Sequence, residues 1–68
     1  RSDWQGIDNP PVKRGWYEYT GWMIEGVTQF YWNSWQWGYW LNQKDRIDWV
    51  HLAENDGDKW RGILAHNA

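Results

Sequence analysis

Residues 27–41 read Val-Thr-Gln-Phe-Tyr-Trp-Asn-Ser-Trp-Gln-Trp-Gly-Tyr-Trp-Leu, an aromatic stretch that decides the fold class. Its two halves, 27–33 and 35–41, consist largely of the aromatic and β-branched residues that favour strands. Asn33-Ser34 separates the halves, and because Asn tolerates a positive φ, the pair predicts a tight two-residue hairpin. Gly38 interrupts the second run and marks either a bulge or a close backbone approach. The stretch therefore predicts two antiparallel strands joined by a hairpin turn.

Strand-like composition continues on both sides of this hairpin. Residues 16–24 are rich in aromatic and β-branched types and form the preceding strand, with Glu25-Gly26 as the turn. Residues 42–48 are a polar connection. Residues 47–53 fit a short strand or a helical turn, and the strand is favoured. We expect an all-β chain, a small antiparallel meander of three to five strands that forms a curled sheet or an SH3-like partial barrel.

The length of 68 residues leaves room for a single small β domain with one core. Residues 1–15 are predicted to be an extended lead-in, in which Pro10 and Pro11 prevent regular structure. Residues 16–53 form the meander, and residues 59–64 form a closing segment. Glycine and acidic residues between these two parts supply a turn.

The sequence Trp-x-Gly-Ile occurs twice, at Trp4–Ile7 and at Trp60–Ile63. The copies are too short and too far apart to be a solenoid repeat. Because chain termini often lie close together in small domains, we favour a clasp in which each tryptophan caps an open end of the core. Coincidence in a tryptophan-rich chain is the alternative.

Composition is dominated by nine tryptophans, with four tyrosines and Phe30. Each large aromatic side chain can bury roughly 150–250 Å², so a few rings can replace many leucines in a core. A domain of this length cannot hide all of these rings. Some are therefore expected to be exposed, and exposed aromatic residues gather where partners bind.

The charge balance and the cysteine count restrict the classes of function. The net charge is −2, and Lys13-Arg14 is the only adjacent cationic pair, which disfavours a protein that mainly grips phosphates. The absence of cysteine excludes disulfides and thiolate metal sites and fits a reducing cytoplasm. No apolar run approaches the length of about 18–20 residues that a transmembrane helix needs, and no export leader is recognised. We expect a cytoplasmic protein without membrane contact.

Catalytic patterns are weak throughout the chain. Ser34, Asp48 and His51 supply the residue types of a triad, but Ser34 lies in a predicted turn without a nucleophile-elbow pattern. Two acidic pairs could serve a glycosidase, but a small sheet offers little cleft to desolvate them. These pairs are Glu18 with Glu25 and Asp45 with Asp48. We expect no catalytic residues and no enzymatic activity.

Metal and cofactor patterns are equally weak. His51 and His66 are not spaced as zinc ligands, and Asp56-Gly57-Asp58 lacks the regular positions of a calcium loop. The glycines match neither a Rossmann nor a phosphate-loop fingerprint. We expect neither a metal nor a cofactor.

Several residues occur in an arrangement that resembles a known group. They are Trp4-x-Gly6, Pro10-Pro11, Gly15, Tyr17-Glu18, Phe30-x-Trp32, Trp35 and Trp60-Arg61-Gly62. The arrangement is similar to that of a loose group of short uncharacterised bacterial and phage proteins. Here Asn33-Ser34 replaces the group's Asp-Gly turn, and the tryptophan spacing is one residue shorter. The resemblance implies a compact antiparallel sheet and a phage or prophage setting, and it supplies no functional residues.

The binding hypothesis centres on rings that one face of the sheet presents to solvent. Alternation places Trp35, Trp37 and Tyr39 on one face of a strand, with Tyr31 on the facing strand and Arg46 nearby. We expect this exposed aromatic patch to bind a protein partner, because such hot spots favour Trp, Tyr and Arg. Single-stranded nucleic acid or carbohydrate could stack on the same rings. Self-association through uncapped edge strands is a further variant, and loops that cover this face would leave no patch.

Overall fold

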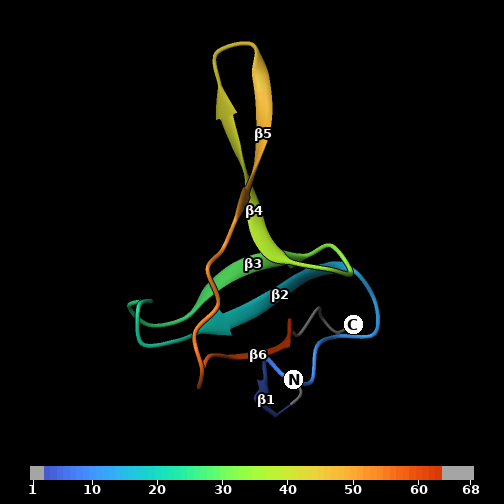
Figure 1. Ribbon diagram of the computed structural model, residues 1–68, viewed down its shortest axis with the longest axis vertical. Helices are drawn as coiled ribbons and strands as arrows, with labels where there is room; N and C mark the ends of the chain where they lie inside the picture. The colour runs from blue at the N-terminus through green and yellow to red at the C-terminus, as the bar shows by residue number, and fades with distance from the viewer. Residues whose placement is uncertain (1–2, 64–68) are drawn as a thin grey trace.

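The computed structural model describes residues 3–63, which form one antiparallel sheet of six strands (Figure 1). The strands are β1 (Gln5–Gly6), β2 (Gly15–Thr20), β3 (Thr28–Trp32), β4 (Trp37–Gln43), β5 (Arg46–His51) and β6 (Lys59–Gly62). Their order in the sheet is β1-β6-β2-β3-β4-β5, and each neighbouring pair is antiparallel. The all-β prediction is confirmed, since β2 to β5 form a meander of consecutive strands. The sheet remains open, because β1 and β5 are its two edges.

Most of the predicted segments correspond to observed strands, with shifted limits. The segment 47–53, ambiguous in sequence, is largely strand β5. The polar connection expected over 42–48 is wrong, because β4 continues to Gln43 and β5 begins at Arg46 after a two-residue turn. The β4–β5 hairpin extends away from the other strands (Figure 1). Its polar residues 42–46 are exposed, and a strand without a buried face can carry them. Residues 1 and 2 of the predicted lead-in, residue 64 of the closing segment and His66 lie outside the described residues.

The hairpin between β3 and β4 turns one residue later than expected. The backbone N–H of Asn33 donates to the carbonyl of Gln36 over 3.2 Å. The Asn33 Oδ1 accepts from the backbone N–H groups of Trp35 and Gln36, at 2.9 and 2.6 Å. Ser34 and Trp35 are therefore the central residues of the turn, and Ser34 has a φ of 80°. Because Trp35 lies in the turn, it does not belong to the strand that carries Trp37.

Ser34→Gly is expected to stabilise the domain by about 1 kcal/mol. A non-glycine residue at positive φ carries roughly this much strain, which glycine avoids. Urea denaturation followed by circular dichroism measures the change. A Ser34→Ala variant keeps the strain and serves as the control. A loss of stability in the glycine variant would contradict the assigned turn geometry.

The core is built from rings on one face of the sheet. Its buried centre consists of Tyr19, Trp32 and Trp37, and partly buried apolar residues surround it: Ile7, Tyr17, Ile24, Phe30, Leu52 and Trp60. Tyr19 and Trp37 have centroids 5.1 Å apart in an edge-to-face arrangement, which aromatic quadrupoles favour. Large rings therefore do replace aliphatic side chains in this core.

The two Trp-x-Gly-Ile copies lie side by side, as the clasp hypothesis predicts. In β1 and β6, Gln5 pairs with Trp60. Trp60 packs against the core ring of Tyr17 at 5.2 Å, and its indole N–H donates to the carbonyl of Asn9 over 3.0 Å. The role expected for Trp4 is wrong, because its ring lies under the Arg61 guanidinium at 4.1 Å and not on the core. The clasp thus has one tryptophan on each face of the sheet.

Candidate functional site

The predicted binding residues do not form one exposed patch. Trp37 is fully buried in the core, which makes its inclusion in a surface platform wrong. Trp35 is 82% exposed in the turn, whereas Tyr39 is 37% exposed on the core side of β4. Arg46 lies at the far end of the β4–β5 hairpin, where it pairs with the carboxylate of Asp48 over 2.9 Å. The face that carries Trp37 is therefore the core face.

Tyr31 lies on the opposite face of the sheet, within a second group of rings. We call this group the outer cluster; it consists of Trp16, Tyr31, Trp40 and Trp49. Tyr31 and Trp40 are closest, with centroids 4.5 Å apart, and Trp40 and Trp49 are directly paired across β4 and β5 at 5.0 Å. The outer cluster therefore links the projecting hairpin to the body of the sheet.

The rings of the outer cluster are packed edge to face and do not make a flat platform. The Trp16 plane is inclined by 77° to Tyr31 and by 64° to Trp40. The Trp49 indole N–H donates to Oε1 of Gln36 over 3.3 Å. Trp16 and Trp40 remain about half exposed, but the steep angles between the ring planes prevent a single flat surface. This geometry suits stabilisation of the hairpin better than stacking on sugars or bases.

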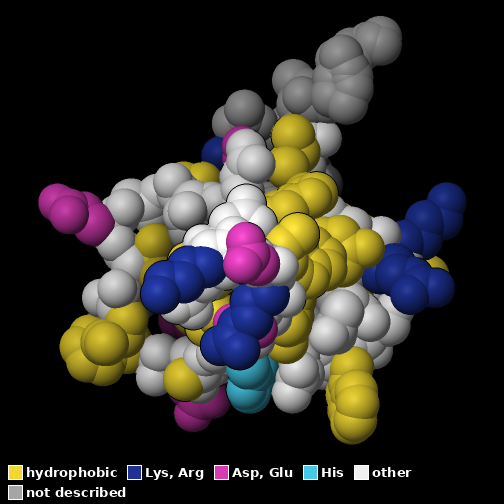
Figure 2. All heavy atoms as spheres, turned by 90° about the horizontal axis from the view of Figure 1, so that it is seen from above, with side chains coloured by type: hydrophobic (Ala, Val, Ile, Leu, Met, Phe, Trp, Pro, Cys, Tyr) yellow, Lys and Arg dark blue, Asp and Glu magenta, His cyan; other side chains and the backbone are white. Residues whose placement is uncertain are grey.

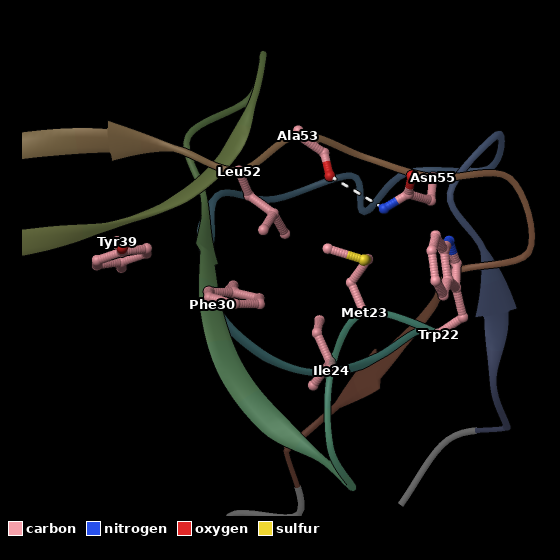
Figure 3. A pocket seen from close by; sticks show the side chains of 8 residues that line it. All are labelled: Trp22, Met23, Ile24, Phe30, Tyr39, Leu52, Ala53 and Asn55. Carbon is pink, nitrogen blue, oxygen red and sulfur yellow. Dashed lines mark hydrogen bonds between the residues drawn. The ribbon is translucent and has the colours of Figure 1, made fainter.

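A groove opens on the core side of the sheet, between the loop after β2 and the segment after β5 (Figure 3). We call it the aromatic groove; it has a volume of about 640 Å³ and is lined by Trp22, Met23, Ile24, Phe30, Tyr39, Leu52, Ala53 and Asn55. Figure 3 shows the rings of Phe30 and Tyr39 on β3 and β4, with Trp22 and Met23 on the loop that faces Leu52. Sequence reasoning found only Tyr39 among these lining residues.

Local hydrogen bonds hold both walls of the aromatic groove. In the first wall, the backbone N–H of Ile24 donates to the carbonyl of Gly21 over 3.0 Å, and Thr20 Oγ1 donates to Gly26 over 2.7 Å. In the second wall, the backbone N–H of Leu52 donates to the carbonyl of Trp37 over 2.8 Å. Each wall is therefore anchored to a strand of the sheet.

A buried carboxylate ties the two walls together. Asp58 is 2% exposed, and its Oδ2 accepts from the Tyr19 hydroxyl over 2.8 Å and from the backbone N–H of Asn55 over 3.2 Å. Its Oδ1 lies against Gly21, where a Cβ would have no room. Burial raises the pKa of Tyr19, and the hydrogen bond to Asp58 and its charge raise that pKa further. In the sequence, Asp58 is merely one acidic residue in a predicted turn.

Tyr19→Phe is expected to destabilise the domain by about 1–3 kcal/mol, because it leaves a buried carboxylate without its hydroxyl donor. The substitution also changes how the stability of the domain depends on pH in the alkaline range. A raised folded-state pKa means that stability is complete below the ordinary tyrosine pKa of 10.0 and is lost as the pH rises above it. Tyr17, whose pKa burial also raises, leaves a residual dependence in the variant.

Urea midpoints measured from neutral pH to above pH 10 test this prediction. We expect the wild-type midpoint to fall steeply above pH 10 and the Tyr19→Phe midpoint to start lower and fall less. Tyr31→Phe, on the other face, is the matched control and should keep the wild-type pH profile. Parallel curves for wild type and Tyr19→Phe would contradict the role of the buried hydroxyl.

The lining of the aromatic groove is apolar and uncharged. Its rim exposes two large side chains, Trp22 at 77% and Met23 at 67%. The polar side-chain groups in the lining are the Asn55 amide, the Tyr39 hydroxyl and the Trp22 indole N–H. The Asn55 amide already donates to the carbonyl of Ala53 over 3.4 Å. In the view towards the hairpin end, Lys and Arg side chains are scattered and form no continuous basic face (Figure 2). The groove is therefore suited to apolar ligands.

The triad candidates Ser34, Asp48 and His51 occupy the β3–β4 turn and strand β5. No hydrogen bond joins them within residues 3–63, and Asp48 is held by Arg46. No group of three or more His, Cys, Asp or Glu side chains within those residues could hold a metal ion. Across the same residues, none of the secondary structure is a helix of sufficient length and apolarity to cross a membrane.

A comparison of the chain with protein-family models, curated proteins and solved structures found no match. The function is therefore inferred from the aromatic groove itself.

Proposed function

We propose that this chain is a non-enzymatic binding module that takes an apolar segment of a protein partner in the aromatic groove. The observation that carries the proposal is the exposure of Trp22 and Met23 at the rim of an uncharged groove. Apolar surface left in water costs about 25 cal/mol per Å², so a partner that covers these side chains gains binding free energy. Trp is also among the residues that most often dominate interfaces, and Met adapts its shape to different partners.

The lining favours a protein segment over the other two ligand classes. A single-stranded nucleic acid needs cationic groups for its phosphates, and the groove has no charged side chain. A carbohydrate needs several polar groups for its hydroxyls, and the lining side chains supply few: those of Asn55 and Tyr39 and the indole N–H of Trp22. An apolar side chain of a peptide needs neither, and a groove of about 640 Å³ has room for one or two such side chains.

The biological setting is part of the proposal. The resemblance to short bacterial and phage proteins supports an accessory role in a phage or prophage, in which a small domain acts by occupying another protein. The lack of cysteine supports a cytoplasmic location.

Met23→Asp is expected to weaken binding of an apolar peptide by about 30-fold, because the partner would bury an unpaired carboxylate in an apolar contact. Peptides are first selected on the wild-type domain from a random library, and their dissociation constants are then measured by calorimetry. Val12→Asp is the matched control, since Val12 is 98% exposed and lies outside the groove. Equal affinities in wild type and Met23→Asp would overturn the assignment of the groove. Tight binding of an oligonucleotide or oligosaccharide at the groove would replace the protein partner with that class.

A further inference from the structure

Among the residues that the structure describes, none pairs with the outer edge of β5, which lies on a projecting hairpin. β5 is the last strand in the sheet order, and it pairs with β4 over six residue pairs, from Gln43 with Arg46 to Gly38 with His51. β4 pairs with β3 at two positions, so within residues 3–63 the far part of the hairpin has no other strand beside it. Figure 1 shows this hairpin standing apart from the remaining strands.

The hairpin register determines which backbone groups of β5 face outwards. Lys44 and Asp45 form a two-residue turn, so the closing pair, Gln43 with Arg46, is hydrogen-bonded. In an antiparallel ladder such pairs alternate, and Asp48 and Val50 therefore also point their N–H and C=O groups towards β4. The bond from the Leu52 N–H to the Trp37 carbonyl continues the same alternation.

It follows that Ile47, Trp49 and His51 direct their backbone N–H and C=O groups away from β4. These residues form the free edge of the sheet.

This edge lacks two devices that usually prevent strand pairing, a proline and a β-bulge. Residues 46–51 contain no proline, and Ile47 is 66% exposed beside the end of the outer cluster. The two charged side chains of the strand, Arg46 and Asp48, lie on the other face of the sheet and are paired with each other over 2.9 Å. Natural edges are more often blocked by a bulge, a proline or an inward-pointing charge.

We propose that β5 pairs with β5 of a second copy, antiparallel about a two-fold axis at Trp49. In this register Ile47 of one copy lies opposite His51 of the other. Asp48 lies opposite Val50, so like charges do not face each other. The register centred on Asp48 places two carboxylates directly opposite, which is destabilising.

The chemistry of the edge selects a second copy over a foreign strand. Any extended strand supplies matching backbone donors and acceptors, so the side chains must favour a second copy. About the two-fold axis at Trp49 no like charges meet, and the same residues serve both sides of the contact. The pairing also brings a second Trp49 beside the first, so the outer cluster continues from one copy into the next. The exposed side chain of Ile47 lies opposite His51 and diagonal to Trp49 of the second copy, on the same face.

Sedimentation equilibrium of the purified chain, from micromolar to millimolar concentration, tests the proposal. We expect a monomer–dimer equilibrium. Ile47→Pro removes an outward N–H and leaves the N–H groups of the β4–β5 ladder in place. Each copy then loses about one hydrogen bond across the interface, so the dissociation constant of the dimer should rise about tenfold or more. Ile47→Lys adds a charge at the edge without a backbone change and should act in the same direction.

Val12→Lys is the matched control and should dimerise as the wild type does, because Val12 is remote from the hairpin pairing. Circular dichroism of each variant establishes that it is folded. A wild-type chain that stays monomeric at millimolar concentration would overturn the proposal. So would a dimer that both Ile47 variants leave intact or that Met23→Asp abolishes, since the aromatic groove would then be the interface.

Discussion

Trp37→Ala is expected to leave the domain largely unfolded at room temperature. Trp37 has no exposed surface, and its ring contacts Tyr17, Tyr19, Trp32 and Trp60 at centroid distances of 5.9, 5.1, 5.1 and 6.2 Å. Removal of a buried Trp typically costs about 3–5 kcal/mol. A core of this size rarely supplies more than about 3–5 kcal/mol in total. The loss is therefore comparable with the whole stability of the domain.

Circular dichroism during thermal and urea denaturation measures this effect. Trp35→Ala is the matched control: Trp35 is 82% exposed, and its removal should change the unfolding free energy by no more than about 0.5 kcal/mol. If Trp37→Ala kept the wild-type melting temperature, Trp37 would be a surface residue and the assignment of the core face would fail.

Gly38→Ala is expected to destabilise the domain by about 2–3 kcal/mol, although alanine usually suits a strand better than glycine. A Cβ at residue 38 would meet the carbonyl oxygen of Val50 closer than real contacts allow, and Cζ2 of Trp49 at 2.6 Å. Relief of this overlap requires the base of the β4–β5 hairpin to move. Trp49 should then lose its packing against Trp40.

Urea denaturation and the indole N–H signal of Trp49 report the two consequences of Gly38→Ala. Gly57→Ala is the control, because a Cβ there meets open space and the cost is only the strain of a φ of 90°, about 1–2 kcal/mol. A Gly38→Ala protein as stable as wild type, with an unmoved Trp49 signal, would show that β4 and β5 are not as close as described.

The positions of most strands could be predicted from local composition, because runs of aromatic and β-branched residues separated by turn residues favour β-strands. The hairpin around Asn33-Ser34 was predicted from local sequence to within one residue of its observed turn, and the pairing of the two Trp-x-Gly-Ile copies was predicted from their repetition. Gly38 was predicted to mark a bulge or a close approach, and the close approach is what it permits. The polar residues 42–48 led to the wrong prediction of a connecting loop, because the strands of a projecting hairpin need no buried apolar face.

The location of the site could not be predicted in the same way. Alternation groups Trp37 with Tyr39 but does not say which face of the strand is covered, and the answer depends on Trp60 and Leu52, far along the chain. The hydrogen bond between Tyr19 and Asp58, which helps to hold the walls of the aromatic groove, joins residues 39 positions apart in the sequence. Loop residues such as Trp22 and Met23 have no periodicity that distinguishes them from the end of a strand.

The most direct test of the aromatic groove is a ¹H–¹⁵N correlation spectrum of the nine tryptophan indole groups, recorded during titration with a selected apolar peptide, a mixed oligonucleotide and an oligosaccharide mixture. Our account predicts that the peptide shifts the signal of Trp22 and leaves those of Trp16 and Trp40 in place. Shifts at Trp16 and Trp40 without a change at Trp22, with any of the three ligands, would contradict it and move the binding site to the outer cluster.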